Sequence, residues 1–205
     1  MTREISTPNP FVAARRVLAL WGLAGTLFVA PAAGAIAAEF NGLSFDDTAS
    51  VGGTELQLNG IGLRSVFILK AFVAALYVPK KSRDAGELIR QPGARRLQIR
   101  MLVDMTPERL LKTFVSGIGE NVGEAQAQAL KPQVEQLNAA LHAVGTARKG
   151  DTLDLDLVDG NLRLLLNGQA RGAPQAGEDL YAAILRALLG DRPLEKDLKR
   201  GLLGG

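Results

Sequence analysis

Residues 60–79 read GIGLRSVFILKAFVAALYVP, a nearly unbroken apolar run with Arg64 near its start. Apolar residues fall on both parities of the run, which predicts strands over 61–69 and 72–78 that are covered on both faces. An arginine keeps its charge inside a protein, and a buried charge needs a partner. If the run is buried, Arg64 therefore requires an anion beside it, either a carboxylate of this chain or a bound ligand.

The sequence around this run predicts an α+β fold. Before it, a polar arm over 39–53 with one short strand leads to a strand over 55–58 and a turn at Asn59-Gly60. After it, periodicity and capping signals predict helices over 84–90, 106–121 and 179–189 and a helical stretch over 124–144 that Pro132 splits. They also predict a short helix from Pro193, strands over 97–103, 153–157 and 162–166, and a hairpin turn at Asn167-Gly168. Leucines alternate with Asp154 and Asp156, which predicts that these aspartates face water. Strands joined by hairpins beside helices favour an antiparallel sheet under helices.

The first 37 residues have the pattern of a secretory signal peptide. Arg15 and Arg16 precede the apolar run 17–30, and Ala35-Ile36-Ala37 matches an A-x-A cleavage site. The apolar run is shorter than the roughly 20 residues that a spanning helix needs. We therefore predict a signal peptide over 1–37, one mature domain over 38–205 without a membrane span, and a periplasmic location.

Composition argues against several classes of function. The chain carries a net charge of +3, of which +2 falls in residues 1–37, so the mature part has too little charge to indicate a nucleic-acid partner. There is no cysteine and a single histidine, His142, and no metalloprotease, phosphate-loop or serine-hydrolase motif occurs. We predict no metal, no cofactor and no nucleic-acid partner.

The apolar run, with Gly60 and Gly62 before Arg64, resembles the central strands of the chalcone isomerase-like superfamily, nearest to its exported bacterial branch. The resemblance continues in PGARRLQIRMLVDMTPERL (92–110), KGDTLDLDL (149–157) and LLGDRPLEKDLKRGLLG (188–204). It implies a chalcone isomerase-like fold, in which a large antiparallel β-sheet with helices packed on one side encloses a cleft.

The resemblance also implies a role for a few positions. The superfamily includes flavonoid-forming isomerases, which are intramolecular lyases, fatty-acid-binding proteins and non-catalytic members. Its arginine for anionic ligands falls on Arg64. The polar positions of the catalytic members fall on Phe72 and Leu110, near Gly117 and near Tyr181. Phe72 and Leu110 cannot orient a water or polarise a carbonyl, which weighs against chalcone cyclisation, and we assign no catalytic residue.

Three hypotheses remain open. In the first, the protein binds a fatty acid or another apolar carboxylate, with Arg64 as the anion anchor and with the cleft formed by Phe72, Ala74, Leu110 and the hydroxyl of Tyr181. In the second, it is an intramolecular lyase of the chalcone isomerase type. In the third, it has a structural or interaction role, and Arg64 pairs with a carboxylate of the chain such as Glu55, Asp104 or Glu120.

Overall fold

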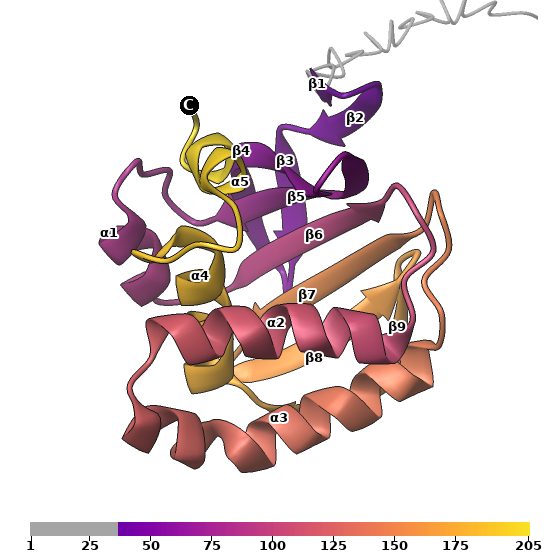
Figure 1. Cartoon of the computed structure of the whole chain (residues 1–205). Helices are drawn as coiled ribbons and strands as arrows, with labels where there is room; N and C mark the ends of the chain where they lie inside the picture. Colours follow the sequence, from indigo (N-terminus) through magenta and orange to yellow (C-terminus); the bar gives the residue numbers. More distant parts are fainter. Residues whose placement is uncertain (1–36) are drawn as a thin grey trace, which may run out of the picture. The chain divides into compact units, whose positions relative to one another are not determined.

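The computed structural model describes residues 37–205, which form a large curled antiparallel sheet and five helices (Figure 1). Seven strands lie in sequence order, each antiparallel to its neighbour: β3 (Thr48–Val51), β4 (Thr54–Val66), β5 (Leu69–Val78), β6 (Arg95–Met101), β7 (Thr152–Val158), β8 (Asn161–Leu166) and β9 (Gln169–Ala176). A separate hairpin of β1 (Ala37–Phe40) and β2 (Leu43–Asp46) precedes them. The predicted α+β class with a large antiparallel sheet is confirmed.

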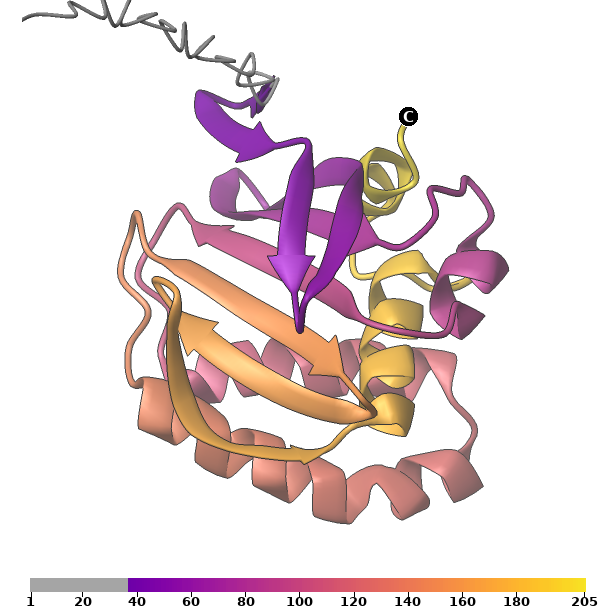
Figure 2. The same ribbon diagram turned by 180° about the vertical axis from the view of Figure 1, so that it is seen from behind.

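The helices pack on one side of this sheet. They are α1 (Ala85–Arg90), α2 (Pro107–Asn121), α3 (Glu124–Val144), α4 (Glu178–Leu189) and α5 (Lys196–Leu202). The predicted split at Pro132 is wrong, because α3 continues through this residue as one helix. In Figure 1, α2 and α3 run across the front of the sheet, and the view from behind in Figure 2 shows the strands of the opposite face without helices over them. The main hydrophobic core lies between the helices and the sheet. A second, smaller core lies on the other face and includes Phe45, Val73 and Tyr77, so β5 is covered on both faces as predicted.

Strand β4 differs from the prediction for this part of the chain. The predicted turn at Asn59-Gly60 is wrong, because β4 continues through it with only a shift of register between Leu58 and Gly60. The side chain of Asn59 instead donates a hydrogen bond to the carbonyl of Leu202 (2.7 Å) and accepts one from the amide of Ser82 (2.8 Å). The turn comes at Phe67-Ile68, where Val66 pairs with Leu69.

The glycines of the Gly60-x-Gly62-x-Arg64 pattern receive the C-terminal helix. Both lie on the helix-covered face of β4, and a Cβ atom on Gly62 would lie only 2.9 Å from the Cα of Leu198 in α5. A Cβ on Gly60 would lie 2.7 Å from the amide nitrogen of Gly204. Real Cβ atoms do not come this close to backbone, so glycine at these two positions is what allows α5 to lie directly on β4.

Asp154 and Asp156 are not solvated, and that expectation is corrected. Their exposed fractions are 4% and 5%. The sheet register places Arg96 opposite Asp156, which accepts two hydrogen bonds from the guanidinium, at 2.6 and 2.7 Å. Asp154 accepts a hydrogen bond from Gln98 (3.0 Å), and burial raises its pKa. Polar partners on the neighbouring strand therefore let these aspartates lie in the sheet away from water.

The structure bears only partly on the predicted signal peptide and on the predicted absence of a membrane span. The predicted signal peptide, apart from its last residue, lies outside the described residues. Between residues 37 and 205 no helix has the length and apolar character required to cross a membrane.

Candidate functional site

A cleft opens between the turn end of the β4–β5 hairpin and helix α2. Its volume is about 450 Å³, within the range of roughly 300–1,000 Å³ that is common for small-molecule sites. Most of its wall is apolar and comes from Val66, Leu69, Ala71, Phe72, Val103, Met105 and Leu194. Its polar wall consists of Arg64, Arg109, Lys112, Thr113 and Ser116. Among the described residues, the cleft wall therefore combines apolar surface with three cations and no carboxylate.

Arg64 reaches this cleft from β4 and is fixed from one side. Its Nη1 atom donates hydrogen bonds to the carbonyls of Ser65 (3.0 Å) and Leu194 (2.9 Å) and to Oε2 of Glu195 (3.4 Å). The same carboxylate oxygen accepts a hydrogen bond from the amide of Ser65 (2.6 Å). These bonds join β4 to the residues just before α5, so Arg64 also helps to hold the C-terminal helix.

The other edge of the guanidinium has no such partners. All three hydrogen bonds leave from Nη1, and Nε is buried without a hydrogen-bond partner within the described part of the chain. Nε and Nη2 together form the edge with which arginine binds a carboxylate through two parallel hydrogen bonds. A buried polar group without a partner is destabilising. Because Nε is buried, an anion in the cleft would reach it after a movement of the Arg64 side chain.

A β-bulge in the β4–β5 hairpin helps to orient the side chain of Arg64. Arg64 pairs with Phe72 across the hairpin, but the next residue, Ser65, pairs with Lys70, so Ala71 is an extra residue in β5. Such β-bulges bend a strand and redirect its side chains. Arg64 and Phe72 consequently lie side by side on the helix-covered face, both at the cleft.

Helix α2 contributes the other two cations. The helix begins at Pro107, as the Thr106-Pro107 signal predicts. Arg109, Lys112, Thr113 and Ser116 follow at spacings of three, four and seven, which places them on one side of a helix. Their neighbours Leu110 and Phe114 belong to the buried side of α2. The same i, i+3, i+4, i+7 pattern was visible in the sequence and could have identified this stripe.

The structure brings together only part of the predicted site. Arg64 and Phe72 line the cleft. Ala74 and Leu110 are almost wholly buried in the main core and are not among the residues lining the cleft. Ala74 lies two residues further along β5, deeper under the helices, and Leu110 is turned about 100° around α2 from Arg109.

Tyr181 lies elsewhere in the core, close to Arg95. The guanidinium of Arg95 stacks 5.2 Å from the centre of the Tyr181 ring, and both side chains are fully buried. Arg95 also pairs with Glu178 and donates to the carbonyl of Ile89 (3.2 Å). The Tyr181 hydroxyl has no hydrogen-bond partner in residues 37–205, and burial raises its pKa. Arg95 is the first residue of β6, and Met101, which pairs with Phe72, is the last. The Arg95–Tyr181 contact therefore lies roughly 20 Å along the strand from Phe72 and the cleft.

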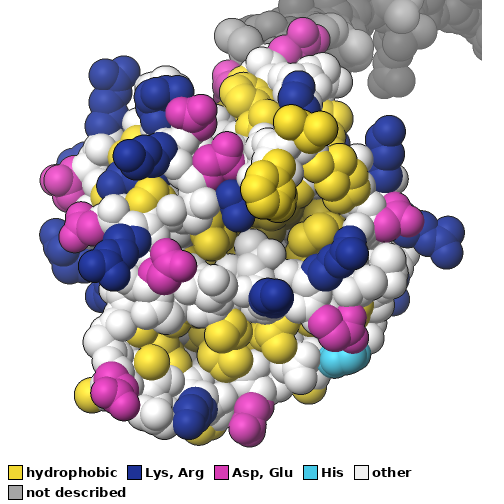
Figure 3. Space-filling model, viewed as in Figure 1, with side chains coloured by type: hydrophobic (Ala, Val, Ile, Leu, Met, Phe, Trp, Pro, Cys, Tyr) yellow, Lys and Arg dark blue, Asp and Glu magenta, His cyan; other side chains and the backbone are white. Residues whose placement is uncertain are grey.

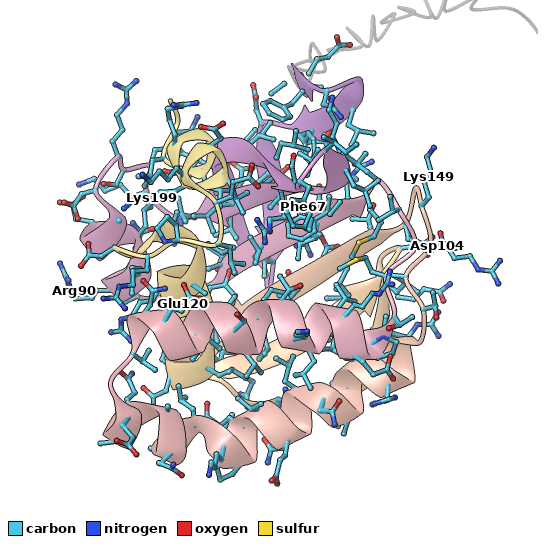
Figure 4. All side chains as sticks on the ribbon, viewed as in Figure 1. Phe67, Arg90, Asp104, Glu120, Lys149 and Lys199 are labelled. Carbon is cyan, nitrogen blue, oxygen red and sulfur yellow. The ribbon has the colours of Figure 1, made fainter. Side chains whose placement is uncertain are left out.

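The internal partner of Arg64 is a residue that we did not consider. Asp104 and Glu120 lie near opposite ends of α2 (Figure 4), and Asp104 accepts a hydrogen bond from the amide of Lys149 (2.8 Å). The carboxylate that reaches Arg64 belongs to Glu195. It lies 131 residues away in the sequence, in the C-terminal segment that α5 carries onto β4. The internal ion pair of the third hypothesis is therefore present, with a partner other than Glu55, Asp104 or Glu120.

A curled antiparallel sheet with helices packed on one side is the fold of chalcone isomerase-like proteins. The family model described as chalcone isomerase-like matches residues 37–204, and the chain belongs to this family. No match was found among curated protein sequences. Among solved structures, the crystal structure of an Arabidopsis thaliana fatty-acid binding protein is similar, with a TM-score of 0.64 and 14% sequence identity over 82% of this chain and 96% of that chain. At this identity the similarity shows a shared fold.

Proposed function

We propose that this chain is an exported, periplasmic member of the family that binds a fatty acid or another apolar carboxylate without catalysing a reaction. The carboxylate lies on the free edge of Arg64, and the acyl chain lies along the apolar wall beside Phe72. One observation carries the proposal: Arg64, whose three hydrogen bonds all leave from Nη1, lines a cleft that combines apolar surface with two further cations. The fatty-acid binding function of the similar Arabidopsis protein supports the same ligand class.

The cations of α2 strengthen the case for an anionic ligand. Glu195 offsets part of the charge of Arg64, but Arg109 and Lys112 add two further positive charges at the same cleft. Both are exposed residues, and within the described residues no ion pair to either of them occurs. They therefore provide long-range attraction for an anion, while Arg64 provides the direct hydrogen bonds.

A binding experiment on charge variants tests this proposal. Native mass spectrometry and titration with a long-chain fatty acid are compared for the wild type, Arg64→Ala, and the double variant Arg109→Ala/Lys112→Ala. A charge-assisted hydrogen bond contributes about 1.5–3 kcal/mol, so Arg64→Ala is expected to weaken binding roughly 10- to 100-fold. The double variant is expected to weaken it by a smaller factor that decreases with added salt.

If Arg64→Ala does not fold, the double variant still tests the proposal, because Arg109 and Lys112 are exposed and their removal leaves the core unchanged. Arg163→Ala, an exposed arginine of β8 away from the cleft, is the matched control and should bind as the wild type does. Wild-type protein that binds no long-chain carboxylate, or charge variants that bind it unchanged, would contradict the proposal.

The ion pair between Arg64 and Glu195 supports a second role for the arginine, in folding. The pair and the bond to Leu194 connect β4 to α5 independently of any ligand. Under this alternative, Arg64→Ala and Glu195→Gln lower the urea concentration at the midpoint of unfolding by similar amounts. Under the ligand hypothesis, Arg64→Ala additionally removes the stabilisation that a fatty acid gives to the wild type.

A further inference from the structure

The turn of the β4–β5 hairpin exposes an apolar tip made of Val66, Phe67, Ile68 and Leu69. Phe67 and Ile68 are 98% and 100% exposed, and Val66 and Leu69 are about half exposed. Of the five large hydrophobic side chains that are exposed in residues 37–205, four belong to this tip. Contiguous exposed apolar side chains of this kind mark interaction surfaces.

Phe67 has a backbone conformation that is unusual for phenylalanine. Phe67 has φ = 56° at the first position of the two-residue turn. Turns of this geometry take glycine there, because a side chain in the left-handed region is strained. The ring of Phe67 is almost fully exposed, so packing within the fold does not compensate for this strain. Backbone strain of this kind clusters at functional positions, which favours a contact of this ring outside the chain.

Three positively charged side chains lie near the tip. Lys70 follows it directly and donates a hydrogen bond to Asn41 in the β1–β2 turn (2.8 Å), and Arg109 and Lys112 lie across the cleft from it. Figure 3 shows hydrophobic side chains gathered on the upper half of this face, with dark blue lysine and arginine side chains beside them. Figure 4 places Phe67 above α2, on the face that also carries the cleft.

An anionic lipid surface fits these features better than a protein partner does. A projecting two-residue tip offers little area compared with the roughly 1,200–2,000 Å² buried in a stable protein interface. Aromatic and aliphatic side chains that insert at the headgroup level, beside lysine and arginine, are in contrast the pattern by which proteins bind anionic membranes without spanning them.

We propose that the β4–β5 tip docks the protein on an anionic phospholipid bilayer. Phe67 and Ile68 insert between the headgroups, and Lys70, Arg109 and Lys112 face the lipid phosphates. Val66 and Leu69 belong both to the tip and to the wall of the cleft, so docking brings the cleft mouth to the bilayer. This inference rests on the proposed function, because it gives an apolar carboxylate a route between bilayer and cleft that avoids water.

Flotation with lipid vesicles tests the docking. Protein produced from the full-length chain is mixed with vesicles of phosphatidylcholine alone or of phosphatidylcholine with phosphatidylglycerol. We expect binding to the phosphatidylglycerol vesicles that decreases with salt. The double variant Phe67→Asn/Ile68→Ser should bind them at least about tenfold more weakly. Asparagine tolerates positive φ, so this variant keeps the turn. Val115→Ser removes another exposed hydrophobic residue, 40% exposed on α2, and should bind as the wild type does.

Equal vesicle binding by the wild type and the tip variant overturns the proposal, as does wild-type protein that binds neither vesicle. Self-association that the tip variant abolishes, in wild-type protein that does not bind vesicles, would instead assign the tip to a second copy of the chain. Fatty-acid binding without vesicles is measured in parallel. Phe67 and Ile68 do not line the cleft, so the tip variant should retain it, and failure of docking is thereby distinguished from failure of the proposed function.

Discussion

The contact between Gly62 and α5 predicts a large effect from a single methyl group. In Gly62→Ala the new Cβ atom would lie 2.9 Å from both Cα and Cδ1 of Leu198, and closer still to the carbonyl oxygen of that residue. The helix backbone cannot yield as a flexible side chain does, so α5 must shift. Extra methyl groups in packed regions destabilise by about 1–3 kcal/mol. Complete detachment would also expose Leu198 and Leu202, both fully buried, at about 1.5–3 kcal/mol each.

Urea unfolding measures this effect. With a slope of about 2 kcal/mol/M, a loss of ~1–3 kcal/mol lowers the unfolding midpoint by about 0.5–1.5 M. Gly119→Ala is the control, because Gly119 lies in α2 with nothing within 4 Å of its missing Cβ. It should raise the free energy of unfolding by up to about 1 kcal/mol. A Gly62→Ala protein that unfolds at the wild-type urea concentration would refute the close approach of α5 to β4.

Three other substitutions have defined outcomes. Tyr181→Phe removes a buried hydroxyl without a partner, so the midpoint of thermal unfolding should stay the same or rise, and a loss above about 1 kcal/mol would show a missed hydrogen bond. Burial raises the pKa of Tyr77 to about 12, so between about pH 10 and pH 12 the native state keeps a proton that the unfolded state has lost. The free energy of unfolding therefore falls over this range, by up to roughly 2–3 kcal/mol, and in urea titrations at each pH Tyr77→Phe should flatten the decline. Asp156→Ala leaves the guanidinium of Arg96 without its paired carboxylate. Calorimetry should show a loss of unfolding free energy near the lower end of about 3–5 kcal/mol, because Arg96 keeps some exposure. A change near zero would mean that Asp154, 3.9 Å from Arg96, replaces Asp156 as its partner.

Short sequence signals correctly predicted a turn and a helix start, because these depend on neighbouring residues alone. Asn167-Gly168 forms the expected turn between β8 and β9, with positive φ at both residues, and Thr106-Pro107 begins a helix. The turn at Phe67-Ile68 was missed because it contains none of the residues that favour turns. Its apolar side chains extend the hydrophobic pattern of the strands on either side. The polar arm before β4 forms three short strands instead of one.

Long-range contacts account for what the sequence could not predict about the site. Arg64 was identified from its charge within an apolar run. Its partner Glu195 and its neighbours Arg109 and Lys112 come from distant segments, and only the folded sheet brings them together. The alternation of Asp154 and Asp156 with leucines was interpreted as a water-facing side because a single strand does not reveal what the neighbouring strand presents. Here that strand presents Arg96 and Gln98.

The placement of α5 on β4 also has a consequence for the order of folding. Most of the sheet joins strands that are adjacent in the sequence, and such local contacts form quickly. The hydrogen bond from Asn59 to Leu202 instead spans 143 residues, and the loop that it closes includes nearly the whole domain. Until this segment docks, the glycine face of β4 and the guanidinium of Arg64 have no cover. Protease susceptibility at the C-terminal segment during refolding should therefore disappear last, and protection there reports that the cleft is complete.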